Sequence, residues 1–341
     1  MPVPPSDQFG GEIESAAETI VEESVGSGLL GQGADIRTAA VGAGDEGRRR
    51  KGQPFGLGAK LAMGWMGCII AIAILSKTGI LTWGDPFESV ARCARKGPFA
   101  DEGTASGYLL GCDSNGRNMA ARLALGAWTS MLVATGAIAL GFLVGGTLGL
   151  IAGYFGGKAD TVLTGMFNVL LSVPSVIMAL ALVAFLQGSP SEAATSGLPP
   201  ELILIIAIGV VSIPLVGRIT RASALSWAQR EFVLAARAQG AKNGRVMVRE
   251  VLPNVLPAMF SISLLGIAVA IVAEGTLSIL GVGVKPPTPS WGNIIALDRG
   301  NLFKSPHIVF EASILIFFTV LALNYLGDVI RARFDVREGA L

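Results

Sequence analysis

The chain has 341 residues, of which 51% are hydrophobic and only 15% are charged, with a formal net charge of +1 and a mean hydropathy of +0.60. Soluble globular domains contain about 25% charged residues, so this composition excludes an ordinary soluble domain and indicates an integral membrane protein. The single histidine, His307, excludes a metal site built from several histidines.

Residues 1–56 differ in composition from the rest of the chain. Acidic side chains stand there among Gly, Ala and Ser, with few large apolar residues. Such a segment cannot bury enough apolar surface to offset the entropy lost on ordering. We therefore expect a disordered, acidic and glycine-rich cytoplasmic tail. A signal peptide is not expected, because the first apolar run begins only near Leu57.

Six stretches are apolar enough to cross a bilayer, which takes about 20 residues of helix. The sequence therefore predicts an all-α membrane protein with six transmembrane helices in a domain over residues 57–338. Pro174 and Pro214 fall inside two of the stretches, where each frees a backbone carbonyl and allows a kink. The six stretches are 58–80, 128–152, 161–187, 201–217, 256–282 and 308–327.

The orientation follows from the basic residues, because Lys and Arg near the membrane favour the cytoplasmic side. They are more numerous on one side if the N-terminus lies inside. We therefore expect both termini in the cytoplasm, residues 82–127 as an extracytoplasmic loop and residues 218–255 as a cytoplasmic loop. Cys93 and Cys112 both fall in the outer loop, in the compartment where disulfides persist.

The second stretch carries glycines at four-residue spacing, Gly141, Gly145, Gly149 and Gly153. Small residues at this spacing let membrane helices approach closely. The pattern predicts a helix-packing face and says nothing of a substrate.

Residues 231–254, EFVLAARAQGAKNGRVMVREVLPN, form a polar insert between two apolar stretches. The sequence predicts a helix over 231–239 that stops at Gly240, and a second helix capped by Asn243 that ends at Pro253. Small alanines on the first helix leave room for another surface. Lys242, Arg245 and Arg249 form a basic stripe that we interpret as facing lipid phosphates. The insert is thus either a cytoplasmic docking element or a basic loop on the membrane surface.

Glu274 is the only carboxylate deep in an apolar run. A charge inside the membrane costs at least about 2.5 kcal/mol on insertion scales, so such a residue is by default paired or functional. Glu274 is therefore a candidate gate or pathway residue. The alternative is a solvated side chain near the outer interface.

Motifs of nucleotide and hydrolytic chemistry are absent. The sequence contains no GxxxxGKS/T phosphate loop, no HExxH and no GxSxG. We expect no catalytic residue and no metal site, and any nucleotide chemistry must come from another chain.

Residues of the insert resemble the EAA signature of ABC importer permeases, through Ala235, Ala236 and Gly240 followed by Leu252 and Pro253. Three further blocks resemble motifs of the peptide/nickel branch of that family, and the resemblance covers about residues 105–338. They are Leu109–Asp113 with Gly116-Arg117, Glu274–Val284 with Pro286–Gly292, and Asn324–Asp328 with Arg331.

The resemblance implies a C-type permease subunit of a peptide or nickel importer in the cytoplasmic (inner) membrane, with a type I importer fold and alternating access. Its implied partners are a paralogous permease, two cytoplasmic ATP-binding subunits and an extracytoplasmic substrate-binding protein, with no nucleic acid. No cofactor is expected on this chain, because ATP and Mg would bind the ATPase subunits. The implied ATPase-coupling loop contains Phe232, Leu234, Ala235, Ala236, Arg237, Gly240, Leu252 and Pro253.

The chain departs from the family pattern at several positions. Leu234 replaces the glutamate of the signature, Cys112 a threonine, Asn118 an aspartate and Glu250 a histidine. Because Cys112 is unusual and Cys93 precedes it in the same loop, we predict a disulfide between them, the alternative being two free thiols. An ion-coupled secondary transporter is the rival function. Such a transporter needs no ATPase but normally needs several intramembrane charges.

Overall fold

The computed structural model describes residues 56–81, 83–98, 108–188 and 197–338. These residues fold into helices joined by loops and short turns, and none of them belongs to a β-strand, apart from one isolated bridge between Cys112 and Asn118. The all-α fold expected from the composition is confirmed. The tail predicted for residues 1–56 lies, except for Gly56, outside the described residues.

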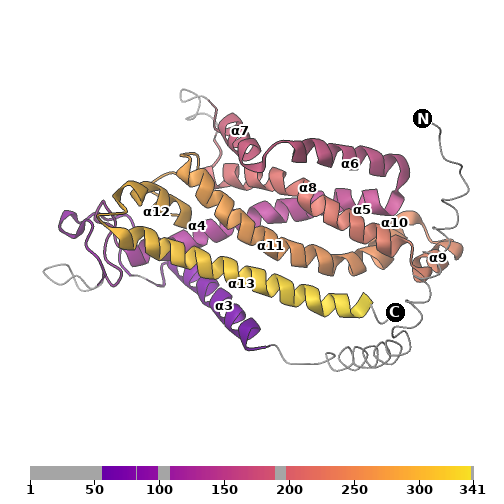
Figure 1. Cartoon of the computed structure of the whole chain (residues 1–341), viewed down its shortest axis with the longest axis horizontal. Helices are drawn as coiled ribbons and strands as arrows, with labels where there is room; N and C mark the ends of the chain where they lie inside the picture. The colour runs from indigo at the N-terminus through magenta and orange to yellow at the C-terminus, as the bar shows by residue number, and fades with distance from the viewer. Residues whose placement is uncertain (1–55, 82, 99–107, 189–196, 339–341) are drawn as a thin grey trace, which may run out of the picture. The chain divides into compact units, whose positions relative to one another are not determined.

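Each of the six predicted stretches corresponds to a helical segment (Figure 1). Five segments are long and apolar enough to cross a membrane, and a sixth passes the same test only as a bent pair. The five are α3 (Leu57–Lys77); α4 (Met119–Leu140) with the π turn η2 (Gly141–Gly145) and α5 (Gly146–Phe155); α8 (Pro200–Ala228); α10 (Asn243–Val246) with the π turn η3 (Met247–Val251) and α11 (Leu252–Ile279); and α13 (Pro306–Glu338). The bent pair is α6 (Gly157–Ser172) and α7 (Ser175–Gln187).

Some helices extend beyond the apolar stretches and into the segments predicted as loops. α4 begins at Met119, inside the predicted loop 82–127, and α8 continues to Ala228, inside the predicted loop 218–255. Apolar content marks the part of a helix that fits the hydrocarbon core, and it does not mark where backbone hydrogen bonding stops.

The two prolines have different effects. At Pro174 the helix is interrupted, and the axes of α6 and α7 differ in direction by 89°. Val173 leaves the helical region (φ −88°, ψ 129°), because the ring of a following proline disfavours helical geometry at the residue before it. The expected kink in the third span is therefore a full break. Pro214 instead lies within the continuous helix α8.

The glycine face of α4–η2–α5 packs on α8, as predicted. A Cβ built on Gly145 would lie 2.3 Å from the carbonyl oxygen of Ile213, and one on Gly149 would lie 2.2 Å from that of Gly217. A Cβ built on Gly153 would lie 2.5 Å from the carbonyl oxygen of Arg221. Only glycine permits this approach, so the two backbones are in direct contact over several turns. α8 also contacts α4, α6, α7 and α11.

Two short helices close the opposite ends of the bundle. α9 (Glu231–Ala238) follows α8 at one end, and α12 (Trp291–Asp298) lies at the other, as Figure 1 shows. The 3-10 turns η1 (Ala91–Cys93) and η4 (Arg299–Asn301) accompany the loops at the α12 end.

The loop before α4 is held by a compact polar cluster and a disulfide. Cys93 and Cys112 are bonded, with Cα atoms 5.9 Å apart, and both side chains are buried. The buried carboxylate of Asp113 accepts from Arg117 Nε at 2.7 Å and lies 3.3 Å from Arg122 Nε. These contacts join the loop to the first turn of α4.

We predict that Gly149→Ala lowers the melting temperature of the detergent-solubilised protein, because the added methyl group overpacks two backbones, at a cost of about 1–3 kcal/mol. The matched control is Gly165→Ala in α6, where a Cβ meets nothing within 4 Å. This control should leave the melting temperature unchanged or raise it, since alanine favours helix. Equal melting temperatures for the two variants would contradict the contact.

We also predict that non-reducing peptide mapping of the purified protein recovers a peptide pair linked through Cys93 and Cys112. Chain-entropy arguments assign such a link about 3 kcal/mol of loop stabilisation. Cys68, an exposed free cysteine of α3, is the internal control and should be alkylated without reductant. Alkylation of all three cysteines in the non-reduced sample would show that the link does not form.

Candidate functional site

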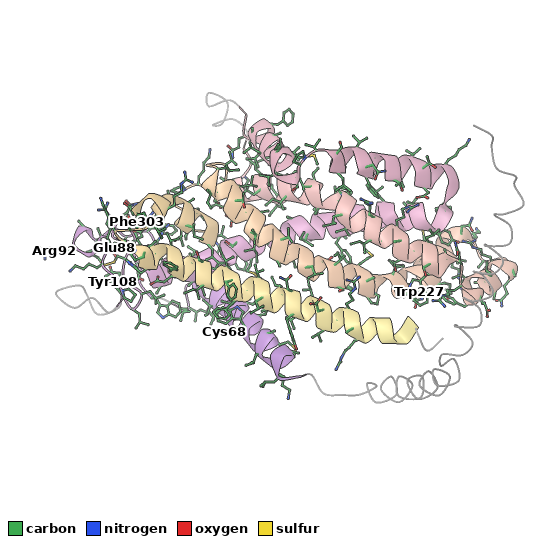
Figure 2. All side chains as sticks on the ribbon, viewed as in Figure 1. Cys68, Glu88, Arg92, Tyr108, Trp227 and Phe303 are labelled. Carbon is green, nitrogen blue, oxygen red and sulfur yellow. A yellow bond between two sulfur atoms is a disulfide. The ribbon has the colours of Figure 1, made fainter. Side chains whose placement is uncertain are left out.

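α9 is attached to the bundle by one buried face. The side chain of Val233 is fully buried, and Ala236 packs partly buried against the same cluster. The cluster brings together residues of α5, α8, α10, η3 and α11, including Tyr154, Trp227 and Val251. Trp227, labelled in Figure 2, lies at this end of the helices. The position of α9 is therefore fixed by apolar packing on several spans.

The outward surface of α9 is exposed and carries apolar groups. Leu234 is 52% exposed, and Ala235 and Glu231 are exposed beside it. Phe232, 40% exposed, lies at the edge of this surface, with its ring 6.2 Å from that of Trp227. Leu234, which replaces the glutamate of the family pattern, thus adds an apolar group to the open face. This surface has no cover within the described chain, so it is suited to a partner that brings its own apolar groove.

Gly240 ends α9 in the way the sequence predicts. Its φ is +83°, a conformation that glycine adopts without a Cβ penalty. The Gly240 amide donates to the Arg237 carbonyl at 2.9 Å, and the Ala241 amide donates to the Ala236 carbonyl at 3.1 Å. These two hydrogen bonds form a Schellman motif. No atom lies within 4 Å of the Cβ position of Gly240, so its backbone conformation is what excludes other residues.

Two details of the predicted second helix are wrong. Asn243 does not cap it, because Lys242 holds the N-cap position and Asn243 is the first helical residue. Pro253 does not end it either, since the helical run continues through η3 into α11. A π turn immediately before Leu252 changes the backbone hydrogen-bonding pattern there. This change accommodates Pro253, which has no amide hydrogen to donate.

Cation–π contacts bind the basic residues around α9. The guanidinium carbon of Arg237 lies 4.7 Å from the ring centroid of Tyr154, and that of Arg230 lies 5.4 Å from the ring of Trp227. Lys242, Arg245 and Arg249 are exposed, as Arg237 is, but no aromatic ring contact is seen for them among the described residues. The predicted basic stripe is therefore available to lipid phosphates, whereas Arg237 is used inside the segment.

Glu274 lies at the other end of the bundle and is almost fully buried, at 1% exposure. Its carboxylate accepts hydrogen bonds from Ser290 at 2.8 Å, Ser278 at 2.9 Å and Ser130 at 3.3 Å. The Gly292 amide also donates to it. The solvated alternative is excluded, and the carboxylate joins α11 to α4 and to the N-terminus of α12, which favours negative charge.

The hydroxyls around Glu274 extend this network to α12. Ser290 caps α12 by accepting from the Asn293 amide at 3.0 Å, and Ser130 accepts from the Trp291 amide at 3.0 Å. The indole of Trp291, fully buried, donates to the Leu123 carbonyl at 3.0 Å. All polar groups of Glu274 thus have protein partners. The arrangement positions α12, while a role of Glu274 in a gate stays a prediction.

Two polar features of the site were not found by sequence reasoning. Tyr154 lies just beyond the predicted stretch 128–152, and its contacts with α9 and α10 join residues far apart in the chain. Glu311 of α13 has both carboxylate oxygens buried without a hydrogen-bond partner among the described residues. Its position within an apolar stretch was the signal that could have identified it.

An apolar cavity of about 230 Å³ lies beside the break between α6 and α7. Its lining comes from α4, α6, α7, α8 and α11 and contains no charged side chain. Ser175 and Ser212 supply the only side-chain hydroxyls of the lining, and Ser212 already donates to the Gly209 carbonyl at 2.7 Å.

Comparison with known proteins gives the family. Residues 145–338 match the model of the "binding-protein-dependent transport system inner membrane component". The chain is 34% identical to the dipeptide transport system permease protein DppC of Alkalihalophilus pseudofirmus, over 69% of this chain and 73% of that protein. It is 32% identical to the glutathione transport system permease protein GsiD of Pectobacterium atrosepticum, over 69% and 74%. It is 33% identical to the di/tripeptide permease DppC of Pseudomonas aeruginosa, over 74% and 79%.

A solved structure shares the fold. The inward-facing MetNI methionine ABC transporter, in its CY5 SeMet soak crystal form, superposes with a TM-score of 0.50 at 19% identity, over 61% of this chain and 94% of that chain. At this identity the likeness concerns the fold alone. The family match and the sequence relatives establish that the chain belongs to the family of binding-protein-dependent transport system inner membrane components, the permease subunits of ABC importers.

Proposed function

We propose that this permease moves peptides or a related small solute across the cytoplasmic (inner) membrane by alternating access driven by ATP hydrolysis on partner subunits. The single observation that carries the proposal is the exposed apolar face of α9, held rigidly at one end of the spans. The relatives named above transport dipeptides, di- and tripeptides or glutathione, which supports a peptide-like cargo.

The proposed assembly contains a paralogous permease, two ATP-binding subunits and an extracytoplasmic substrate-binding protein. α9 would enter a groove of an ATPase subunit, which places this end of the helices and both termini in the cytoplasm. ATP and Mg would bind those subunits, and this chain would carry no cofactor and no catalytic residue. Rigid seating of α9 lets a movement of the ATPase displace the spans as a body.

The family match argues against the alternative of an ion-coupled secondary transporter. Such a transporter would need several titratable groups along a pathway. Glu274 is held by neutral donors, and Glu311 is a buried carboxylate without a partner among the described residues. Co-purification distinguishes the two functions, because only the importer permease should retain an ATP-binding subunit and lose uptake when ATP is removed.

We expect Ala235→Glu to leave the chain inserted in the membrane but to abolish ATPase capture and uptake. Ala235 is exposed on the docking face, and a charge at a packed interface centre costs about 2 kcal/mol or more. Ala236→Glu should also fail, but it disturbs the cluster beneath α9 as well. The measurement is pull-down of the ATPase subunits with each variant.

Gly240→Val should weaken capture by a different route, because a β-branched residue at φ +83° is strained. Arg245→Gln, a change at an exposed basic position just beyond the bend, is the matched control and should retain capture. Normal capture and uptake with both Ala235→Glu and Gly240→Val would mean that the segment is only a basic loop on the membrane surface.

At the opposite end, Glu274→Gln should keep most of the uptake, since an amide still accepts from serine hydroxyls. Glu274→Leu should lower both uptake and melting temperature, because each unpaired buried hydroxyl costs about 1–3 kcal/mol. Uptake into proteoliposomes, normalised to inserted protein, is the measurement. Equal uptake by the two variants would remove Glu274 from any positioning role.

A further inference from the structure

One side chain of α5 contacts both parts of the α9–α10 segment. Tyr154, in the last turn of α5, is 6% exposed. Its ring faces the guanidinium of Arg237 in α9 at 4.7 Å, and its hydroxyl donates to Asn243 Oδ1 in α10 at 3.3 Å. A movement of α9, or of the span that begins with α10, must therefore displace Tyr154 or break these contacts.

The turn that follows Tyr154 is fixed on its other side. Asp160, in the first turn of α6, accepts from the guanidinium of Arg221 in α8, with Nη2 and Oδ2 2.6 Å apart. The hydroxyl of Thr164 donates to the same carboxylate at 3.0 Å. The end of α5 and the start of α6 are thus joined to α9 and α10 through Tyr154, and to α8 through Asp160.

A displacement of the turn between α5 and α6 can reach the interior of the bundle through the contacts of both helices with α8. α5 moves with α8 because their backbones are in contact at Gly149 and Gly153. α6 packs on α8 through the fully buried Phe167, whose ring leaves no room for a Cβ on Gly217. α6 then ends at the break that borders the apolar cavity.

We infer that Tyr154 is a positioning residue that transmits displacement of the α9–α10 segment to α5 and α6. This inference rests on the proposed function. Tyr154 lies behind α9 and outside its exposed face, so it acts on transport through Arg237 and Asn243 and does not itself form the docking surface. Its loss should uncouple ATP hydrolysis from transport while leaving ATPase capture intact.

The test uses the assembled transporter, with its own ATPase, partner permease and binding protein, reconstituted into proteoliposomes. Uptake and ATP hydrolysis are measured on the same sample. Tyr154→Leu should capture the ATPase like the wild type, yet transport about fivefold less substrate per ATP hydrolysed, because both the cation–π contact and the hydroxyl are lost. Tyr154→Phe keeps the ring over Arg237 and should stay within about twofold of the wild type.

Phe185→Leu is the matched control, a loss of an aromatic ring near the end of α7 from a residue that is 82% exposed. It should leave the ratio of uptake to hydrolysis unchanged. Should Tyr154→Leu fail to insert, Tyr154→Met carries the same expectation, since its flexible side chain fills apolar gaps. Failure of both to insert would overturn the inference, because Tyr154 would then be required for folding.

The remaining outcomes separate the inference from the proposed function. If Tyr154→Leu loses ATPase capture, or if uptake and hydrolysis fall in equal proportion, Tyr154 only maintains the structure and the inference is overturned. If the wild-type chain captures no ATPase and its uptake needs no ATP, the proposed function itself fails.

Discussion

Direct backbone contact between α5 and α8 is the constraint on which the other contacts depend. Lipid removes the hydrophobic drive that packs helices in water, so close approach must supply the attraction instead. Glycines at four-residue spacing allow this close approach. Carbonyl oxygens of α8 lie next to the positions that the Cβ atoms of other residues would occupy. Only two residues separate the end of α8 from the start of α9. The contact between α5 and α8 therefore also sets the position of α9.

The two ends of the bundle are organised by different physics. At the α9 end, apolar side chains and cation–π contacts hold a short helix whose outer face stays open. At the α12 end, a buried carboxylate is satisfied by serine hydroxyls and by the Gly292 amide at the N-terminus of α12. Hydrogen bonds to a buried carboxylate are directional, so they position α12 closely, whereas the packing at the α9 end leaves a surface that, under the proposed function, accepts another protein.

Sequence reasoning located the features that depend on local pattern. The six apolar stretches, the glycine face and the left-handed Gly240 each follow from residue type and spacing alone. Helix ends were placed poorly, since α8 continues through polar residues to Ala228 and the helical run continues from η3 into α11, past Pro253. Tyr154, Arg237 and Asn243 could not be grouped in advance, because their contacts join three helices and only the packing of α5 on α8 brings them together.

The exposed face of α9 and the buried ring beneath it have complementary physical roles. Phe232 and Leu234 expose apolar surface. The chain alone cannot bury this surface by rotating α9, because Val233 and Ala236 already occupy the inward face. Because α9 is already folded and packed on the bundle, binding to a partner would not require the helix to become ordered. Under the proposed function, any displacement of the partner must then pass into the helices that hold α9. One of these contacts is the ring of Tyr154 against Arg237. The α6–α7 break beside the apolar cavity is where a rigid displacement of α6 would change the shape of the interior.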